Sequence, residues 1–167
     1  SFAENTVGSE DQVYMLRGAA ACAALVRGVG SYKAAAERAG GDVSVAFIRK
    51  WARVHYLPRA IRRHVARGTI APTAAKHIAR VAGDDRYALA WATLEHGVTV
   101  REIRRLASEV GNGTDVESAL SERGLTFGRM GVTLPSDQYV ELRRRASVEN
   151  RDPDGLVADA LDEFLEL

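Results

Sequence analysis

Cysteine is almost absent from this chain, and so are long apolar runs. Cys22 is the single cysteine among 167 residues, which excludes an internal disulfide and a cysteine-based zinc site and favours a reducing compartment. No stretch of about 18 apolar residues runs without a charge, so no membrane span is expected. The start, SFAENTVGSEDQ, lacks the basic region and apolar core of a signal peptide. We therefore expect a cytoplasmic protein of one ordinary domain or two small ones.

Motifs for catalysis and for nucleotide or metal binding are missing as well. The sequence contains no GxxxxGKS or GxxxxGKT loop, no GxGxxG and no GxSxG motif. Its four histidines lack the HExxH spacing and the cysteine companions of a zinc site; they are His55, His64, His77 and His96. We therefore predict no catalytic residue, no metal and no cofactor, and we expect that the protein is not an enzyme.

Charge is distributed unevenly, although the formal net charge is only +1. Residues 31–110 carry 15 basic and 7 acidic side chains, and residues 31–80 alone carry 11 and 2. Residues 111–167 carry 6 basic and 12 acidic side chains. This asymmetry predicts a cationic binding face beside an anionic region.

Capping residues and glycines divide residues 9–111 into short helices that follow a loose end, residues 1–8. Ser31 and Ser44 are expected N-caps, and Thr99 with Glu102 has the spacing of a capping box. Gly28 and Gly30 are expected to end the first helix. The pattern predicts a bundle of about seven helices, at residues 9–27 (capped by Ser9), 31–39, 44–56, 58–67, 72–81, 84–97 (capped by Asp84) and 99–111.

The pattern changes after residue 111. Residues 112–125 are predicted to be a linker with one possible short helix. Residues 129–134 alternate apolar and polar side chains, which predicts a strand that ends at Pro135. Ser136 is expected to cap a helix that runs to Glu149, and a last helix from about residue 154 to 167 has a regular apolar stripe. The expected order of this tail is β-α-α.

Residues 31–56 have the spacing of a helix-turn-helix. The second helix buries Ile48, Trp51 and Val54, so its other faces are free for a partner. A helix that enters the major groove needs free N-terminal residues for base edges and nearby cations for phosphates. We therefore predict that the following residues face DNA: Ser44, Val45, Ala46, Arg49, Lys50 and Arg53. The alternative is an ordinary helical hairpin with a solvated basic face.

Residues 31–110 resemble the central DNA-binding domain of the ParB/KorB partition proteins. The resemblance rests on SYKAAAERAG, on Ser44-Val45-Ala46-Phe47-Ile48, on Leu57-Pro58 after Arg53, on APTAAKHIARV and on GVTVREIRRL. It implies that Ser44, Arg49, Lys50 and Arg53 face DNA and that Thr73, Lys76 and His77 add contacts. Nothing matches that family's nucleotide-binding domain, so nucleotide binding, clamp sliding and spreading are not carried over. For the phosphates we expect contacts from Arg59, Arg62, Arg63 and Arg67.

Residues 129–167 resemble a ribbon-helix-helix domain of the MetJ/Arc/CopG type, from the strand that leads into Leu134-Pro135 and from the two helices after it. The resemblance implies that the strand pairs with the strand of a second chain, so that the homodimer core contains Met130, Val132, Leu134, Leu156, Val157, Leu161 and Phe164. Arg129, Gly131 and Thr133 would face outward, where that family reads the major groove. Asp152 and Asp154 would repel a phosphate at the second helix, so dimerisation is expected before DNA contact. The alternative is a helical hairpin that docks on its own bundle.

Together these patterns predict a mainly α protein with a ParB-like helix-turn-helix bundle at residues 9–111 and a ribbon-helix-helix dimerisation domain at residues 126–167. The predicted function is sequence-specific binding of a palindromic double-stranded DNA site by a homodimer, in transcriptional regulation or plasmid or chromosome partition, at the nucleoid. The alternative is an adaptor whose basic bundle binds an acidic protein. Both would bind more weakly in salt, but only the first would be competed by plain duplex DNA.

Overall fold

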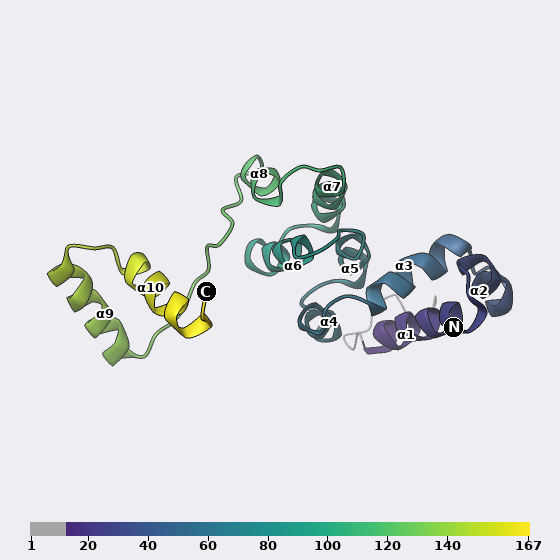
Figure 1. The fold of residues 1–167 in the computed structure, drawn as a ribbon, viewed down its shortest axis with the longest axis horizontal. Coiled ribbons are helices and arrows are strands. Elements are labelled where there is room, and N and C mark those ends of the chain that lie inside the picture. Colours follow the sequence, from purple (N-terminus) through teal and green to yellow (C-terminus); the bar gives the residue numbers. More distant parts are fainter. Residues whose placement is uncertain (1–12) are drawn as a thin grey trace. The chain divides into compact units, whose positions relative to one another are not determined.

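The computed structural model of the chain describes residues 13–167, which form ten helices and no strand (Figure 1). The described chain divides into two compact units between Arg129 and Met130. The predicted loose end at residues 1–8 and the Ser9 cap lie outside the described residues. No single described helix is long and apolar enough to cross a membrane, although α1 and α2, bent by 114° at their junction, would meet that criterion if they were counted together.

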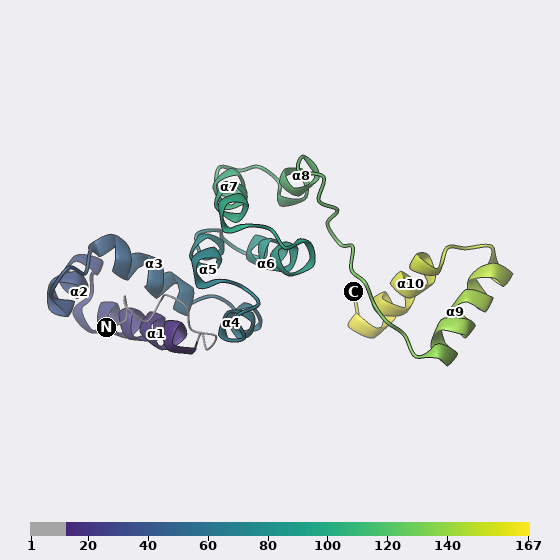
Figure 2. The ribbon, with the colours of Figure 1, turned by 180° about the vertical axis from the view of Figure 1, so that it is seen from behind.

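The described part of the first unit contains eight helices, which confirms the series of short helices predicted from caps and glycines. Figure 2 shows the same helices from behind. In chain order they are α1 (Val13–Val29), α2 (Tyr32–Ala39), α3 (Val45–His55), α4 (Arg59–Ala66), α5 (Pro72–Ile78), α6 (Asp85–His96), α7 (Val100–Gly111) and α8 (Val116–Ser121).

Three predicted N-caps are confirmed by their hydrogen bonds. The hydroxyl of Ser31 accepts the backbone N–H of residue 34, and the hydroxyl of Ser44 accepts that of residue 47, both at 3.1 Å. Thr99 accepts the N–H of Glu102, whose carboxylate in turn accepts the N–H of Thr99 at 2.9 Å. These bonds satisfy donors that a helix leaves free in its first turn, so local chemistry places the starts of α2, α3 and α7.

Two predicted helix ends and one cap differ from the structure. Helix α1 passes through Gly28 and ends at Val29, because a helix tolerates one glycine at a cost of about 1 kcal/mol. Gly30, with φ of 79°, follows that end. Helix α5 ends at Ile78, not near residue 81. Asp84 precedes α6 without a side-chain capping bond.

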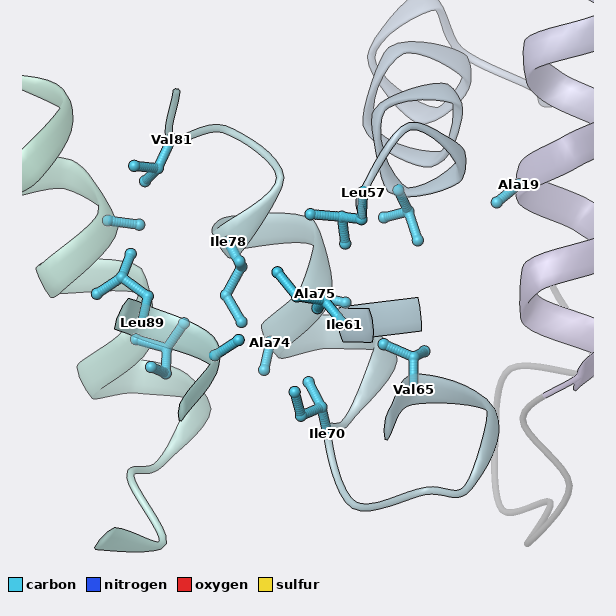
Figure 3. Packing of buried hydrophobic residues seen from close by; sticks show 14 of the residues in the cluster. Ala19, Leu57, Ile61, Val65, Ile70, Ala74, Ala75, Ile78, Val81 and Leu89 are labelled. Atoms are coloured by element: carbon cyan, nitrogen blue, oxygen red, sulfur yellow. The ribbon is translucent and has the colours of Figure 1, made fainter. Parts of the chain in front are cut away.

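Helix α5 lies at the centre of the first unit and packs against α3, α6 and α7 (Figures 1 and 2). Its buried side chains Ala74, Ala75 and Ile78 meet Leu89 of α6 and Ile61 of α4 in one apolar cluster (Figure 3). The alanines allow the helices to approach closely. No described polar or charged side chain is fully buried, so the packing of apolar side chains holds these helices together.

Replacing Ile78 with alanine is expected to lower the free energy of unfolding by about 2–5 kcal/mol, because the side chain is fully buried and its loss leaves a cavity. Urea denaturation followed by circular dichroism measures this loss. Replacing the exposed Ala82 with serine, four residues away, is expected to change stability by less than about 0.5 kcal/mol. Similar effects at the two positions would contradict the central place of α5 in the core.

The second unit consists of two helices, α9 (Ser136–Glu149) and α10 (Pro153–Leu165), and the predicted strand at residues 129–134 is wrong. A strand needs a neighbour for its backbone hydrogen bonds, and no described segment pairs with these residues. Residues 129–133 are all exposed. The predicted β-α-α fold class is therefore wrong, and the described chain is all-helical. Pro135 is the N-cap of α9, so the prediction that Ser136 caps this helix is also wrong.

Candidate nucleic-acid interface

Residues 43–83, which carry α3, α4 and α5, contain no aspartate or glutamate; we call them the basic segment. No described carboxylate lies within ion-pair distance of a cation in this segment. Its positive potential is therefore not neutralised by ion pairs with described residues. The lysines and arginines of the segment, all exposed except the half-buried Arg62 and Lys76, are Arg49, Lys50, Arg53, Arg59, Arg62, Arg63, Arg67, Lys76 and Arg80.

Helix α3 presents an exposed cationic stripe. Ala46, Arg49, Lys50 and Arg53 are spaced i, i+3, i+4 and i+7, so they lie on one face, and all four are exposed. The opposite face buries Ile48, Trp51, Ala52 and Val54. The helix is therefore fixed by its apolar side and offers its basic side to solvent.

Two of the other residues predicted on α3 have structural roles. The Ser44 hydroxyl is exposed but already accepts the capping bond. Val45 is half-buried and packs against the core. Of the predicted recognition residues, the structure thus brings Ala46, Arg49, Lys50 and Arg53 together on one face.

Two aromatic rings hold cations at this interface. The Arg49 guanidinium lies over the ring of Tyr32 in α2, 5.3 Å from its centre. The Lys76 ammonium of α5 lies over the buried ring of Trp51 in α3, at 5.4 Å. Cation–π contacts restrict these long side chains without neutralising them, so the charges are available to an anionic partner.

Helix α4 supplies a second set of predicted cations. Arg59, Arg63 and Arg67 are exposed, whereas Arg62 is half-buried and its Nε atom is buried without a hydrogen-bond partner. Burial and then the charge of Arg62 hold the pKa of His55 below its ordinary value. Positive charge therefore continues from the C-terminal end of α3 onto α4.

On α5, Thr73 is exposed, and Lys76 and His77 are half-buried. Burial lowers the pKa of His77, and the charges of Arg80, Lys76, Arg104 and Lys50 lower it further, in that order. Every charged group of the described residues that acts on this histidine is a cation. No group of three or more histidine, cysteine or acidic side chains gathers as metal ligands would among residues 13–167.

One protein family matches most of the chain, over residues 1–125. The chain belongs to this family of unknown function, DUF7119. No curated protein and no solved structure matches the chain. The family match corrects the expected assignment to ParB/KorB partition proteins, which rested on motifs that are each common in helical DNA-binding proteins. The DUF7119 match includes the whole basic segment, α3 to α5.

The ribbon-helix-helix assignment of the tail, which lies beyond the DUF7119 match, is also wrong, because residues 129–167 contain no strand. Arg129, Gly131 and Thr133 lie in an exposed loop, not on the outer face of a ribbon. Met130 and Val132 are 67% and 65% exposed, and Leu134 is half-buried.

The predicted dimerisation residues on α10 are also largely uncovered. Leu156 is half-buried, Val157 is 38% exposed, and Leu161 and Phe164 are 47% and 78% exposed. In the whole second unit only Ala146 of α9 is buried. Within their own unit, most of the surface of these apolar side chains therefore stays uncovered.

Three arginines at the cationic surface were missed from the sequence: Arg27, Arg80 and Arg104. Arg27 of α1 donates a hydrogen bond to the Tyr56 hydroxyl at 3.0 Å, which joins the end of α1 to the end of α3. Arg80 and Arg104 act on His77. The basic segment includes Arg80, so its charge pattern could have identified that residue. Arg104 has Glu102 and Glu109 nearby in sequence, and only the packing of α7 against α5 places it near His77.

Proposed function

We propose that this protein binds double-stranded DNA sequence-specifically through α3, as a homodimer. The observation that carries the proposal is the stripe of Arg49, Lys50 and Arg53, exposed and without a described acidic partner, on a helix whose other face is buried. An α-helix fits the major groove, and arginine and lysine are the usual donors to guanine edges there. The smaller Ala46 on the same face would permit close approach to the bases.

The cations of α4 fit the second requirement of a DNA-binding surface. Arg59 and Arg63 lie on the exposed side of α4 and the exposed Arg67 caps its C-terminal end, and arginine pairs well with phosphate oxygens. Contacts of this kind position a protein on the duplex without reading its sequence. We therefore assign base contacts to α3 and backbone contacts to α4.

Self-association is proposed from the size of the second unit. Met130 to Leu167 comprises 38 residues with a single buried side chain. A unit below about 40 residues rarely buries enough apolar surface to be stable without a disulfide, a metal or a partner chain. The described residues contain neither a disulfide nor a metal-ligand cluster, so a partner surface is the remaining source of stability.

A second copy of the same unit is the partner that fits the exposed apolar surface of the second unit best. In the described first unit, the exposed large apolar side chains are spread along the chain from α1 to the residues after α8: Val13, Tyr14, Tyr56, Val100 and Phe127. In the second unit ten such side chains are concentrated within 38 residues, among them Val157, Leu161, Phe164 and Leu165 on α10. A symmetric dimer would pair this surface with itself. Two-fold symmetry would then present two copies of α3 to a palindromic site.

Such a protein would act at the nucleoid, in the cytoplasm, in transcriptional regulation or in plasmid or chromosome partition. The competing proposal is an adaptor whose basic segment binds an acidic protein. Both depend on the same cations, so the ligand must be identified directly.

Selection from a pool of random duplexes, followed by fluorescence anisotropy, tests the proposal. We expect enrichment of a palindromic site and a plot of log K against log salt concentration with a slope of about −9, for roughly five phosphate contacts per protomer. Unlabelled duplex should compete, whereas polyglutamate of equal charge should compete poorly. Absence of an enriched sequence, with polyglutamate competing as well as DNA, would favour the adaptor.

A further inference from the structure

Three helices bring cations together around His77. Lys76 and His77 belong to α5, Arg80 follows its end, Lys50 projects from α3 and Arg104 from α7. Helix α5 packs against both α3 and α7 and lies between them in Figures 1 and 2. Lys50, Arg80 and Arg104 are exposed. We call these five residues the α5 cluster.

The burial of the two ring nitrogen atoms of His77 shows which of them can meet a ligand. Nδ1 is buried and has no hydrogen-bond partner. Nε2 makes no hydrogen bond with a described residue either, but unlike Nδ1 it is not fully buried. Nε2 therefore reaches solvent, on the side of the ring that can meet a ligand.

The cations of the α5 cluster repel one another. The pKa of Lys76 lies below its ordinary value because of burial and then the charge of Lys50, and the pKa of His77 is lowered by burial and by all four neighbouring cations. No described carboxylate contributes to either effect. An anion among these groups would relieve the repulsion, so the arrangement favours an anionic ligand.

We propose that Lys76, His77, Arg80 and Arg104, beside the base-reading Lys50, form one binding site for a backbone phosphate of duplex DNA, in which His77 donates a hydrogen bond from Nε2 as a neutral imidazole. This inference rests on the proposed function and deepens it. It extends the interface beyond α5 to Arg80 and to Arg104 of α7, which were not predicted from the sequence.

Neutral His77 is the form that the geometry favours. A second proton would be placed on Nδ1, where it would be a buried donor without an acceptor, and it would add a charge beside four cations. The neutral ring needs only one N–H, on Nε2. The four cations supply the charge for the phosphate, and His77 supplies a fixed donor direction.

Duplex binding by the full-length chain tests this site with paired variants. Arg104→Gln is expected to weaken binding about tenfold for every duplex sequence. In a dimer that loses two contacts, the slope of log K against log salt should become shallower by about 2. Arg105→Gln is the matched control, because this neighbouring arginine acts on the carboxylates of Glu102 and Glu109 instead. The control should leave both quantities unchanged.

Two substitutions of His77 and a comparison of affinity at two pH values test the role of this histidine. Glutamine places its amide N–H near the position of Nε2, so His77→Gln should bind within about threefold of wild type. His77→Leu should bind at least about tenfold more weakly, because it leaves a charged acceptor without this donor. Wild-type affinity should not change between pH 7 and pH 8. A rise of about tenfold per unit of falling pH would show that a proton is taken up and would overturn the neutral-donor assignment.

The two proposals fail in different ways. If wild type binds duplex DNA and loses binding when α3 is altered, but Arg104→Gln and His77→Leu bind normally, the α5 cluster is not a phosphate site and the proposed function stands. If wild type binds no duplex at all, both proposals are overturned. Thermal unfolding midpoints equal to wild type for Arg104→Gln and His77→Leu will show that any lost affinity is a loss of contact.

Discussion

Affinity for the selected DNA site is expected to fall by about a thousandfold or more when Arg49, Lys50 and Arg53 are all replaced with glutamine. Each base-edge contact contributes about 1–3 kcal/mol of discrimination, and the dimer would lose three side-chain contacts on each protomer. Fluorescence anisotropy with the selected duplex and with a scrambled duplex measures the loss. The preference for the selected sequence should disappear along with the affinity.

The chain contains a matched control for this experiment. Arg143, Arg144 and Arg145 are three consecutive exposed arginines on α9. Arg144 and Arg145 both bond to Glu141, whose pKa they lower to about 2. Replacing all three with glutamine removes the same formal charge from the protein but should change DNA affinity by less than about threefold, because Arg144 and Arg145 are already paired with Glu141 and all three arginines lie outside the basic segment.

We expect the loss of DNA affinity to depend on where positive charge is removed, not on how much of it is removed. All six arginine and lysine positions are exposed, so both triple variants should keep the thermal stability of wild type within about 0.5 kcal/mol per site. Equal losses of affinity in the two variants would mean that binding follows net charge. That result would contradict the assignment of α3 as the reading helix.

Dissociation to a monomer is expected when Leu161 and Phe164 are both replaced with serine. These side chains are 47% and 78% exposed within their own unit, and each loses about 1.5–3 kcal/mol of apolar burial if a second copy covers them. Sedimentation velocity at micromolar concentration measures the change. Because the unit has one buried side chain of its own, we also expect part of the helical circular dichroism signal to be lost with the dimer.

The control for the dimer lies on the same turn of α10. Asp162→Ser together with Glu163→Ser alters two exposed side chains outside the apolar stripe, so the dimer should persist. The monomeric variant should also bind the palindromic duplex at least about a hundredfold more weakly than the control, since it must bind each half-site independently. A wild-type chain that sediments as a monomer would refute the proposed self-association.

Local chemistry explains which elements could be predicted from the sequence. The starts of α2, α3 and α7 depend on a side chain and a backbone N–H three residues away, so Ser31, Ser44 and Thr99 identify them without knowledge of the fold. The ends are harder to predict, because a helix continues or stops according to the packing of its last turn. Helix α1 continues through Gly28 for this reason, and α5 stops at Ile78.

The strand at residues 129–134 shows where pattern reasoning failed. An alternation of apolar residues matches the pattern of one strand in a sheet, but a strand exists only when another segment accepts and donates its backbone hydrogen bonds. The described chain supplies no such segment, and Met130 and Val132 remain exposed. The family resemblances failed in a related way, because short helical motifs recur in unrelated bundles.

The sequence by itself determined the succession of short helices, the basic segment at residues 43–83 without a single acidic residue, and the apolar stripe of α10, because all three depend on spacing along the chain. Only the tertiary structure decided which side chains share a surface. It packed the half-buried Val45 against the core, set Lys76 over Trp51, and brought Arg104 of α7 close enough to His77 of α5 for its charge to act on that ring. Such contacts join residues far apart in sequence through the packing of helices, and no local pattern specifies that packing.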